Sequence, residues 1–443
     1  MQTTTTDLHA LHRRHVLTPW SVQGKLDPPA IERGEGVFLY DDTGKRYLDL
    51  SSGLVCVNLG HGNRTVVDAI AEQARRLCFA GPNLFNNTRA ELAAALSELS
   101  PWSEGCRAFF TTGGAEANED AIKVARTLTG RPKILTAYRS FHGSGAGAST
   151  LTGENRRWYA EPGIPNVVHF IGPNPYRSPF HTDDPAEETR RALDHLEFIV
   201  NYENPQKVAA ILIETVVGSN GVIVAPPGYL AGVRALCERH GILMIMDEVM
   251  TGFGRIGAPF GCLRFGVVPD MITFAKGVTS AYVPLGGLLL RESLASRYDT
   301  EVFGGGHTYS GHPLAVAAGR AALRAYAEGA LFERAREIET WLRAGLEEIA
   351  ARSSTIGDVR GIGAFFAIEF VRDKKTREPL VPWQGPGMGP LAAFYANLMR
   401  RGVYAFGRYN VTVISPPLTI EREELALAFE ALAESVAELE RGL

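Results

Sequence analysis

Six short apolar runs, separated by stretches with the periodicity of helices, constrain the fold of this 443-residue chain more than any other feature. The runs are AFFTT at 108–112, KILTAY at 133–138, VAAILI at 208–213, ILMIM at 242–246, MITFA at 271–275 and LGGLLL at 285–290. Strands that are apolar along their whole length are typical of a parallel sheet buried on both faces. We therefore expect an α/β fold in which helices sandwich a mostly parallel sheet.

The length of the chain favours more than one domain, because single cores stop growing at roughly 250–300 residues. We predict an N-terminal segment at 1–60 that joins a small domain, a large domain at 61–320 and a smaller α+β domain at 321–443. The first segment contains a hairpin sequence, VFLYDDTGKRYLDL, and the last contains a strand, FFAIEFV, and a final amphipathic helix from Arg422 to Arg441. The Pro-rich stretch 173–189 is expected to be a surface connection.

Charge and composition exclude several classes of protein. Lysine and arginine number 45 and aspartate and glutamate 49, a net charge of −4, and no long block of one sign occurs. We expect neither a nucleic-acid partner nor a membrane partner. The N-terminus lacks the apolar region of a signal peptide, and no run of about 18 apolar residues occurs, so a soluble cytoplasmic protein is expected. The five cysteines include no C-x-x-C pair, which argues against a disulfide framework or a zinc site.

Four chemically notable positions follow apolar runs directly. They are Gly113-Gly114, Glu214, Asp247 and Lys276. In an open α/β sheet, ligands bind outside the carboxyl ends of the strands. The sequence therefore predicts a ligand site there.

Gly113-Gly114 lies near the start of the string TTGGAEANEDAIKVAR, which predicts the end of a strand, a turn and a helix beginning near Ala115. Glycines let the backbone approach an anion, and the first turn of a helix binds phosphate, although a simple strand-to-helix turn has the same pattern. Phe141-His142-Gly143 offers either a core aromatic or a surface on which a planar heterocycle can stack. Thr308, in HTYSGHPLA, could bond phosphate or cap a helix.

Asp247 and Lys276 have the types of side chain that act on a cofactor. A carboxylate ending an apolar strand needs a cation or a donor, which could be a protonated ring nitrogen or an arginine such as Arg255. Lys276 lies between MITFA and GVTSAYVPLGG with no adjacent acid, so desolvation would favour its neutral, nucleophilic amine. These flanking runs are too apolar for a solvated surface lysine.

The blocks TTGGAEANEDAIKVAR, DEVMTGFGR, FAKGVTSAYVPLGG and HTYSGHPLA, in this order, resemble the class III (subgroup II) aminotransferases. The resemblance extends from LDLSSGLVCVNLGHGN to VISPPLTI and so covers nearly the whole chain. It implies the pyridoxal-phosphate fold type I, the fold of aspartate aminotransferase. It also implies that the large domain binds pyridoxal 5'-phosphate, and that the unit is a homodimer or a higher homo-oligomer with shared active sites.

The resemblance also implies roles for single residues. Lys276 would bind the coenzyme covalently and move the proton, and Asp247 would pair with the pyridine nitrogen. Val249 and Phe141 would pack the two faces of the ring. The other implied coenzyme contacts are the backbone N–H groups of Gly114 and Ala115 to the phosphate, Thr308 to the same phosphate from a neighbouring subunit, and His142 and Glu214 at the rim.

The substrate residues implied by the resemblance are Trp20, Val55, Phe85 and Arg408. Relatives often have tryptophan where Val55 stands, so one wall should be wider here, with Trp20 as compensation. Relatives also often have serine at Ala115 and tyrosine at Phe141. Arg408 is the only cation in VYAFGRYNVTVISPPL, where relatives carry a movable arginine, but the register also allows Phe406 in that place.

The expected activity is amino-group transfer from an amine or ω-amino acid to a keto acid, with pyruvate as the expected acceptor, by a ping-pong mechanism. A 2-oxoglutarate-dependent enzyme of the 4-aminobutyrate or ornithine type is the alternative. A non-catalytic nucleotide-binding α/β protein using Gly113-Gly114 is a weaker one, because the fingerprint glycines and the ribose-binding acid are missing. A non-catalytic or regulatory relative conflicts with the intact Asp247 and Lys276.

Overall fold

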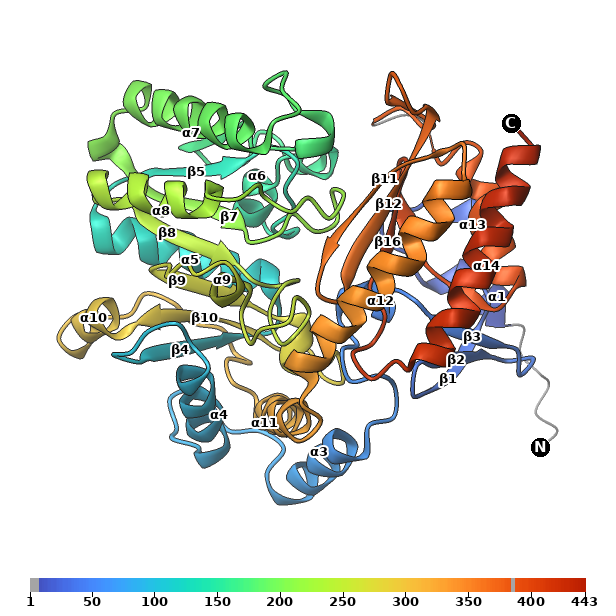
Figure 1. Ribbon diagram of the computed structural model, residues 1–443. Coiled ribbons are helices and arrows are strands. Elements are labelled where there is room, and N and C mark those ends of the chain that lie inside the picture. Colours follow the sequence, from blue (N-terminus) through green and yellow to red (C-terminus); the bar gives the residue numbers. More distant parts are fainter. Residues whose placement is uncertain (1–7, 384–386) are drawn as a thin grey trace.

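The computed structural model describes residues 8–383 and 387–443, and its largest element is a seven-stranded sheet in the order β4-β10-β9-β8-β7-β5-β6 (Figure 1). Its strands are β4 (Cys106–Thr111), β5 (Lys133–Ala137), β6 (Val167–Phe170), β7 (Val208–Glu214), β8 (Leu243–Asp247), β9 (Met271–Phe274) and β10 (Gly286–Arg291). Strands β5 to β9 pair in parallel, whereas β10 is antiparallel to both β4 and β9. The predicted mostly parallel sheet is confirmed, and all six apolar runs are strands. The sequence missed β6, which has only four residues.

Helices cover both faces of this sheet because alternate strand residues point to opposite sides. Leu212 of β7 belongs to a cluster with Ala121 of α5 (Gly114–Thr129), whereas the neighbouring Ile211 packs in a cluster with Val233 of α8 (Tyr229–His240). The other helices around the sheet are α4 (Asn87–Glu98), α6 (Ala146–Leu151), α7 (Pro185–Tyr202), α9 (Gly261–Arg264) and α10 (Glu292–Ala295). The sheet is therefore buried on both sides, as fully apolar strands require.

Helix α7 begins inside the Pro-rich stretch that was predicted to be a surface connection. The side chain of Asp184 caps the helix by accepting a hydrogen bond from the backbone N–H of Ala186. Pro185 occupies the first turn, where its missing N–H costs nothing. The prediction was thus wrong for 185–189, because proline and aspartate mark a helix start as well as a loop.

Two smaller sheets lie beside the large one (Figure 1). The first contains β1 (Ile31–Glu35), β2 (Phe38–Asp41), β3 (Arg46–Asp49) and β14 (Val403–Tyr404). The second contains β11 (Ile356–Ile362), β12 (Phe365–Asp373), β16 (Val411–Ile414) and β15 (Phe406–Arg408), with β13 (Glu378–Pro379) paired to β12. The predicted hairpin is present as β2 and β3, and β14 pairs in parallel with β3. One sheet therefore contains strands from the N-terminal segment and from the C-terminal part of the chain. The proposed domain boundaries stay a prediction.

The remaining helices lie between these sheets along the chain or at either end of it. They are α1 (Leu8–His15), α2 (Ser52–Val55), α3 (Arg64–Arg76), α11 (Pro313–Glu328), α12 (Leu331–Arg352), α13 (Leu391–Arg400) and α14 (Arg422–Arg441). Six short 3-10 helices complete the described chain: Gln23–Lys25, Asn155–Ala160, Pro175–Arg177, Pro205–Lys207, Lys276–Val278 and Ser296–Asp299. The final helix has the predicted bounds. Across the described residues, every helix is too short or too polar to cross a membrane.

A buried arginine joins the three parts of the structure. Arg255 is fully buried, and its guanidinium donates to the carbonyls of Ala364 (3.0 Å) and Pro416 (2.6 Å). It also donates to Ser52 Oγ (3.1 Å) and Asn58 Oδ1 (2.6 Å). Burial lowers the pKa of Arg255 to about 10, so it remains a cation near neutral pH.

We expect Arg255→Met to lower the free energy of unfolding by about 3 kcal/mol or more, because it leaves four buried acceptors without a donor. Urea unfolding followed by circular dichroism measures this change. The control is Arg372→Met, which removes an exposed arginine and should change the value by less than about 1 kcal/mol. Equal effects of the two substitutions would contradict a joining role for Arg255.

Candidate active site

Three acidic or basic side chains gather where adjacent strands of the large sheet end. Glu214 and Asp247 are the last residues of β7 and β8 and lie opposite each other in the strand register. Lys276 follows β9 by two residues. The structure thus brings together three of the four predicted strand-end positions, and the fourth, Gly113-Gly114, begins α5 beside them.

The carboxylate of Asp247 is buried and receives three hydrogen-bond contacts. Its Oδ2 lies 2.8 Å from Asn118 Nδ2 and 2.8 Å from His142 Nδ1, and its Oδ1 accepts from the backbone N–H of Val249 (3.0 Å). Arg255 binds elsewhere, so the alternative that it neutralises Asp247 is wrong. The sequence did not indicate Asn118, although it follows Gly114 by one helical turn.

Lys276 has an unusual backbone and an unpaired amine. Its φ is +46°, a left-handed conformation that non-glycine residues rarely adopt. Within the described part of the chain, Nζ donates no hydrogen bond and forms no ion pair. Burial lowers the pKa of Lys276, although the nearby Cys56, Asp247 and Glu214 oppose that shift. A lowered pKa increases the fraction of neutral amine, which is the nucleophilic form.

The start of α5 offers backbone N–H groups to an anion. Gly113 precedes the helix, and no side chain caps it. A Cβ on Gly114 would lie only 2.7 Å from Val249 Cγ2, and one on Gly143 only 2.5 Å from the Cβ of Ala115. Glycine is therefore required for this close packing, which leaves the uncapped N–H groups and the helix dipole available for a phosphate.

Phe141 is fixed between an acid and a cation. Its backbone N–H donates to Glu214 Oε1 (2.9 Å), while the other oxygen of Glu214 accepts from Gly218 N–H (2.7 Å). Burial raises the pKa of Glu214 to about 7. The guanidinium of Arg156 lies 3.6 Å from the centre of the Phe141 ring and 5.8 Å from that of Trp20.

Arg408 and Arg156 share one buried carboxylate. Nη2 of Arg408 lies 2.5 Å from Glu154 Oε2 and 2.5 Å from Asn155 Oδ1. Arg156 pairs with the other oxygen of Glu154 and donates to Ser219 Oγ (2.8 Å). Sequence reasoning missed Glu154, Asn155, Arg156 and Ser219, and the only sequence indication was the charged string ENRR within a loop.

The remaining predicted residues lie apart from this cluster. Val55 is only 1% exposed and packs with Phe406 in an apolar cluster, so its side chain lies within the core. Phe85 and Thr308 are exposed, and within the described residues neither side chain forms a hydrogen bond or ion pair with the other site residues.

Residues 22–436 match the family described as aminotransferase class-III, and the chain belongs to this family. A probable aminotransferase of Mycobacterium tuberculosis is 38% identical over 406 residues, which cover 89% of this chain and 86% of that protein.

Two solved structures are similar over 98% of both chains. One is the taurine:2-oxoglutarate aminotransferase from Bifidobacterium kashiwanohense, in complex with PLP and glutamate (43% identity, TM-score 0.95). The other is an (S)-enantioselective omega-transaminase from Thermomicrobium roseum (37% identity, TM-score 0.92). The fold is therefore that of fold type I transaminases, and the protein is an aminotransferase that depends on pyridoxal 5'-phosphate.

The observed residues fit this coenzyme. The uncapped start of α5 suits its phosphate, the buried carboxylate of Asp247 suits a protonated ring nitrogen, and the unpaired amine of Lys276 suits its aldehyde.

We expect Lys276→Ala to abolish covalent attachment of the coenzyme and the associated absorbance at about 400 nm, because no other amine replaces Nζ. Spectra of the purified holoenzyme before and after borohydride treatment, followed by mass spectrometry, test this. Lys207→Ala, at an exposed lysine, serves as the control and should keep the band. Borohydride fixation of the coenzyme to a different residue would disprove the assignment of Lys276.

Proposed function

We propose that this aminotransferase moves an amino group from an ω-amino acid to a keto acid in a ping-pong reaction, using the cluster around Lys276. The observation that carries the proposal is the pair of arginines, Arg156 and Arg408, that shares Glu154 beside Phe141. Substrates with an anionic end need such cations, whereas simple amines do not.

Each residue of the cluster would have a separate role in the reaction. Lys276 binds the coenzyme covalently and carries the proton at the reacting carbon, and Asp247 keeps the ring nitrogen protonated. When bound, pyridoxal phosphate supplies the electron sink for the carbanion. Phe141 and Val249 pack against the two ring faces. The remaining proposed contacts are Gly114 and Ala115 to the phosphate, Thr308 to the phosphate of a second copy, and His142 and Glu214 as the groups that hold Asp247 and Phe141 in place.

The charges in the substrate region favour an anion. Two guanidinium groups face one carboxylate, so the cluster of Glu154, Arg156 and Arg408 has a net charge of about +1 when all three are ionised. Burial and the nearby charge of Arg408 both lower the pKa of Arg156, so the Arg156 cation is poorly solvated. A sulfonate or carboxylate on the substrate would relieve this repulsion through charge-assisted hydrogen bonds. Trp20, over Arg156, forms one side of this region.

For the acceptor, we propose 2-oxoglutarate in place of the pyruvate expected from the sequence. A dicarboxylate can engage both arginines, whereas pyruvate needs only one. The similarity to a protein described as a taurine:2-oxoglutarate aminotransferase supports this choice and also supports a β-amino sulfonate as donor. Pyruvate remains the second candidate because the substrate motifs GLVCVN, PLGG and SPPL favour it. A cytoplasmic location stays a prediction.

In the second half-reaction, the enzyme that holds the amino group passes it to a keto acid. We expect this step to be at least about tenfold more efficient with 2-oxoglutarate than with pyruvate, because a hydrogen bond to a charged group is worth roughly 1.5–3 kcal/mol. Arg156→Leu and Arg408→Leu should remove most of this difference. The half-reaction with an amine that has no anionic group, such as butylamine, should stay within about threefold of the wild-type rate. Stopped-flow spectra of each half-reaction measure these rates.

The control for this experiment is Arg372→Leu, an exposed arginine that should have no effect. Equal rates with 2-oxoglutarate in the wild type and both variants would refute the arginine proposal. If the wild type reacted faster with pyruvate than with 2-oxoglutarate, pyruvate would be the acceptor, and the assignment of Lys276 would be unaffected.

We also propose that the active unit is a homodimer. Phe85 is fully exposed, Leu84 and Phe79 are largely exposed, and Phe79 makes a ring contact (6.1 Å) with exposed Tyr309, next to Thr308. An exposed apolar group of this kind is typical of an interface. A second copy placed here would bring Thr308 toward the phosphate of its partner.

We expect Phe85→Asp to shift the protein toward monomers and to weaken coenzyme binding by about tenfold or more, since burying an unpaired charge is costly. Light scattering and coenzyme titration measure the two effects together. Leu427→Asp, at a half-exposed leucine on α14, is the matched control. A monomeric variant with unchanged coenzyme affinity would contradict phosphate binding across subunits.

A further inference from the structure

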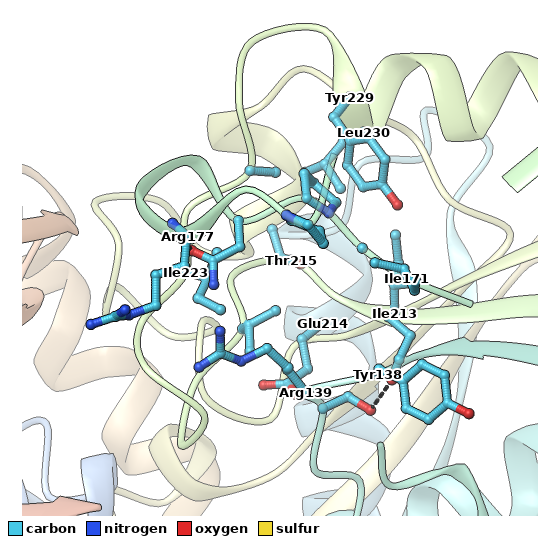
Figure 2. Close-up of a pocket in the computed structure, with 18 residues that line it drawn as sticks. Tyr138, Arg139, Ile171, Arg177, Ile213, Glu214, Thr215, Ile223, Tyr229 and Leu230 are labelled. Carbon is cyan, nitrogen blue, oxygen red and sulfur yellow. Dashed lines mark hydrogen bonds between the residues drawn. The ribbon is translucent and has the colours of Figure 1, made fainter. Parts of the chain in front are cut away.

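A cavity next to the coenzyme residues lies at the carboxyl ends of β5, β6 and β7 (Figure 2). Its volume is about 120 Å³, and it is partly open to solvent. Phe141, Asp247 and Lys276 do not line it, whereas Glu214 does. Ligands of α/β sheets collect at this edge, so the position suits a second ligand.

Most of the cavity wall is apolar. The aliphatic side chains and prolines come from the loop after β6, from β7 and the bend that follows it, and from the start of α8. They are Ile171, Pro173, Ile213, Val217, Ile223 and Leu230. Small-molecule sites commonly combine such walls with a few placed polar groups. This wall suits a short aliphatic group.

One buried donor in the wall has no protein partner. Tyr229 is only 4% exposed, and its hydroxyl forms no hydrogen bond with any described residue. In Figure 2 the hydroxyl end of its ring points from α8 toward Ile171. Burial raises the pKa of Tyr229, so it stays a neutral phenol that can donate. Buried hydroxyl groups are nearly always paired, and an unpaired one therefore calls for a ligand.

Two arginines line the cavity together with Glu214. Arg139 lines it with φ of +64°, and its Nε has no partner among the described residues. Its guanidinium lies 4.4 Å from the centre of the Trp383 ring, which limits its movement. Arg177 also lines the cavity, and although its Nε pairs with Glu369, its Nη2 is unpaired within the described chain. Arg177 is already paired with Glu369, whereas Arg139 forms no ion pair among the described residues, so Arg139 is the cation that can attract an anion.

We propose that this cavity binds a small monocarboxylate with a short aliphatic body, at a site distinct from that of the amino donor and acceptor. The aliphatic body would fill the space between Ile171, Ile213 and Leu230. The carboxylate would accept a hydrogen bond from Tyr229, and Arg139 would attract it through its charge. Glu214 lines the cavity and also accepts a hydrogen bond from the N–H of Phe141. A ligand in the cavity would therefore change the position of Phe141 and, through it, the packing of the coenzyme ring.

The test is isothermal titration calorimetry of the holoenzyme with 3-methylbutyrate. We expect one molecule bound per chain, and at least about tenfold weaker binding in Tyr229→Phe and in Arg139→Asn, since hydrogen bonds to a charged group are the stronger class. Asparagine tolerates the left-handed backbone at position 139. Tyr229→Phe removes an unpaired donor, so its melting temperature should be unchanged or higher.

Two further variants separate this site from the substrate site. Arg408→Leu should leave 3-methylbutyrate binding unchanged, as should Tyr202→Phe, which alters an exposed tyrosine on α7. Weaker binding in Arg408→Leu with normal binding in Tyr229→Phe would place the ligand in the substrate site and overturn the proposal. Absence of binding to the wild type at millimolar concentration would overturn it as well. Nuclear Overhauser contacts from the ligand methyls to Ile213 would support it independently of the variants.

Discussion

The buried carboxylate of Asp247 is the interaction on which the site depends. A charge at the end of an apolar strand costs several kcal/mol unless donors surround it. Here the donors come from α5, from the loop after β5 and from the bend after β8, through Asn118, His142 and Val249. One charge therefore fixes the relative position of three elements. The same three elements carry the start of α5, Phe141 and Val249, so the proposed ring site and the proposed phosphate site share one framework.

Strained backbone accompanies this arrangement. Lys276, Val55 and Arg139 all have positive φ although each has a side chain that disfavours it. Such conformations persist only where the surroundings enforce them, and they concentrate at functional sites. Lys276 follows β9 by two residues and begins a short 3-10 helix, so its left-handed backbone lies where the strand gives way to a turn.

Much of the fold could be predicted from local pattern. The six apolar runs, the hairpin and the helix at 422–441 all depend on periodicity and turn residues within a few positions of one another. The antiparallel direction of β10 and the short strand β6 could not be predicted, because pairing direction is a property of the whole sheet. In the site, Glu214, Asp247 and Lys276 were visible as polar residues at strand ends. Asn118, Glu154 and Arg156 were not, since their partners are distant: Glu154 and Arg408 are 254 positions apart.

The position of Glu154 has a consequence for selectivity. This side chain is completely buried, and it already occupies both guanidinium groups that an incoming anion would use. Glu154 thus competes with any external anion for the two arginines, and because it belongs to the chain its local concentration is high and constant. An external anion gains only the difference between its own contacts and those it displaces, while a molecule without an anionic group leaves the remaining positive charge of the cluster unbalanced. Discrimination then rests on exchange between two carboxylate-like groups, which depends more on their geometry than on the total charge of the molecule that enters.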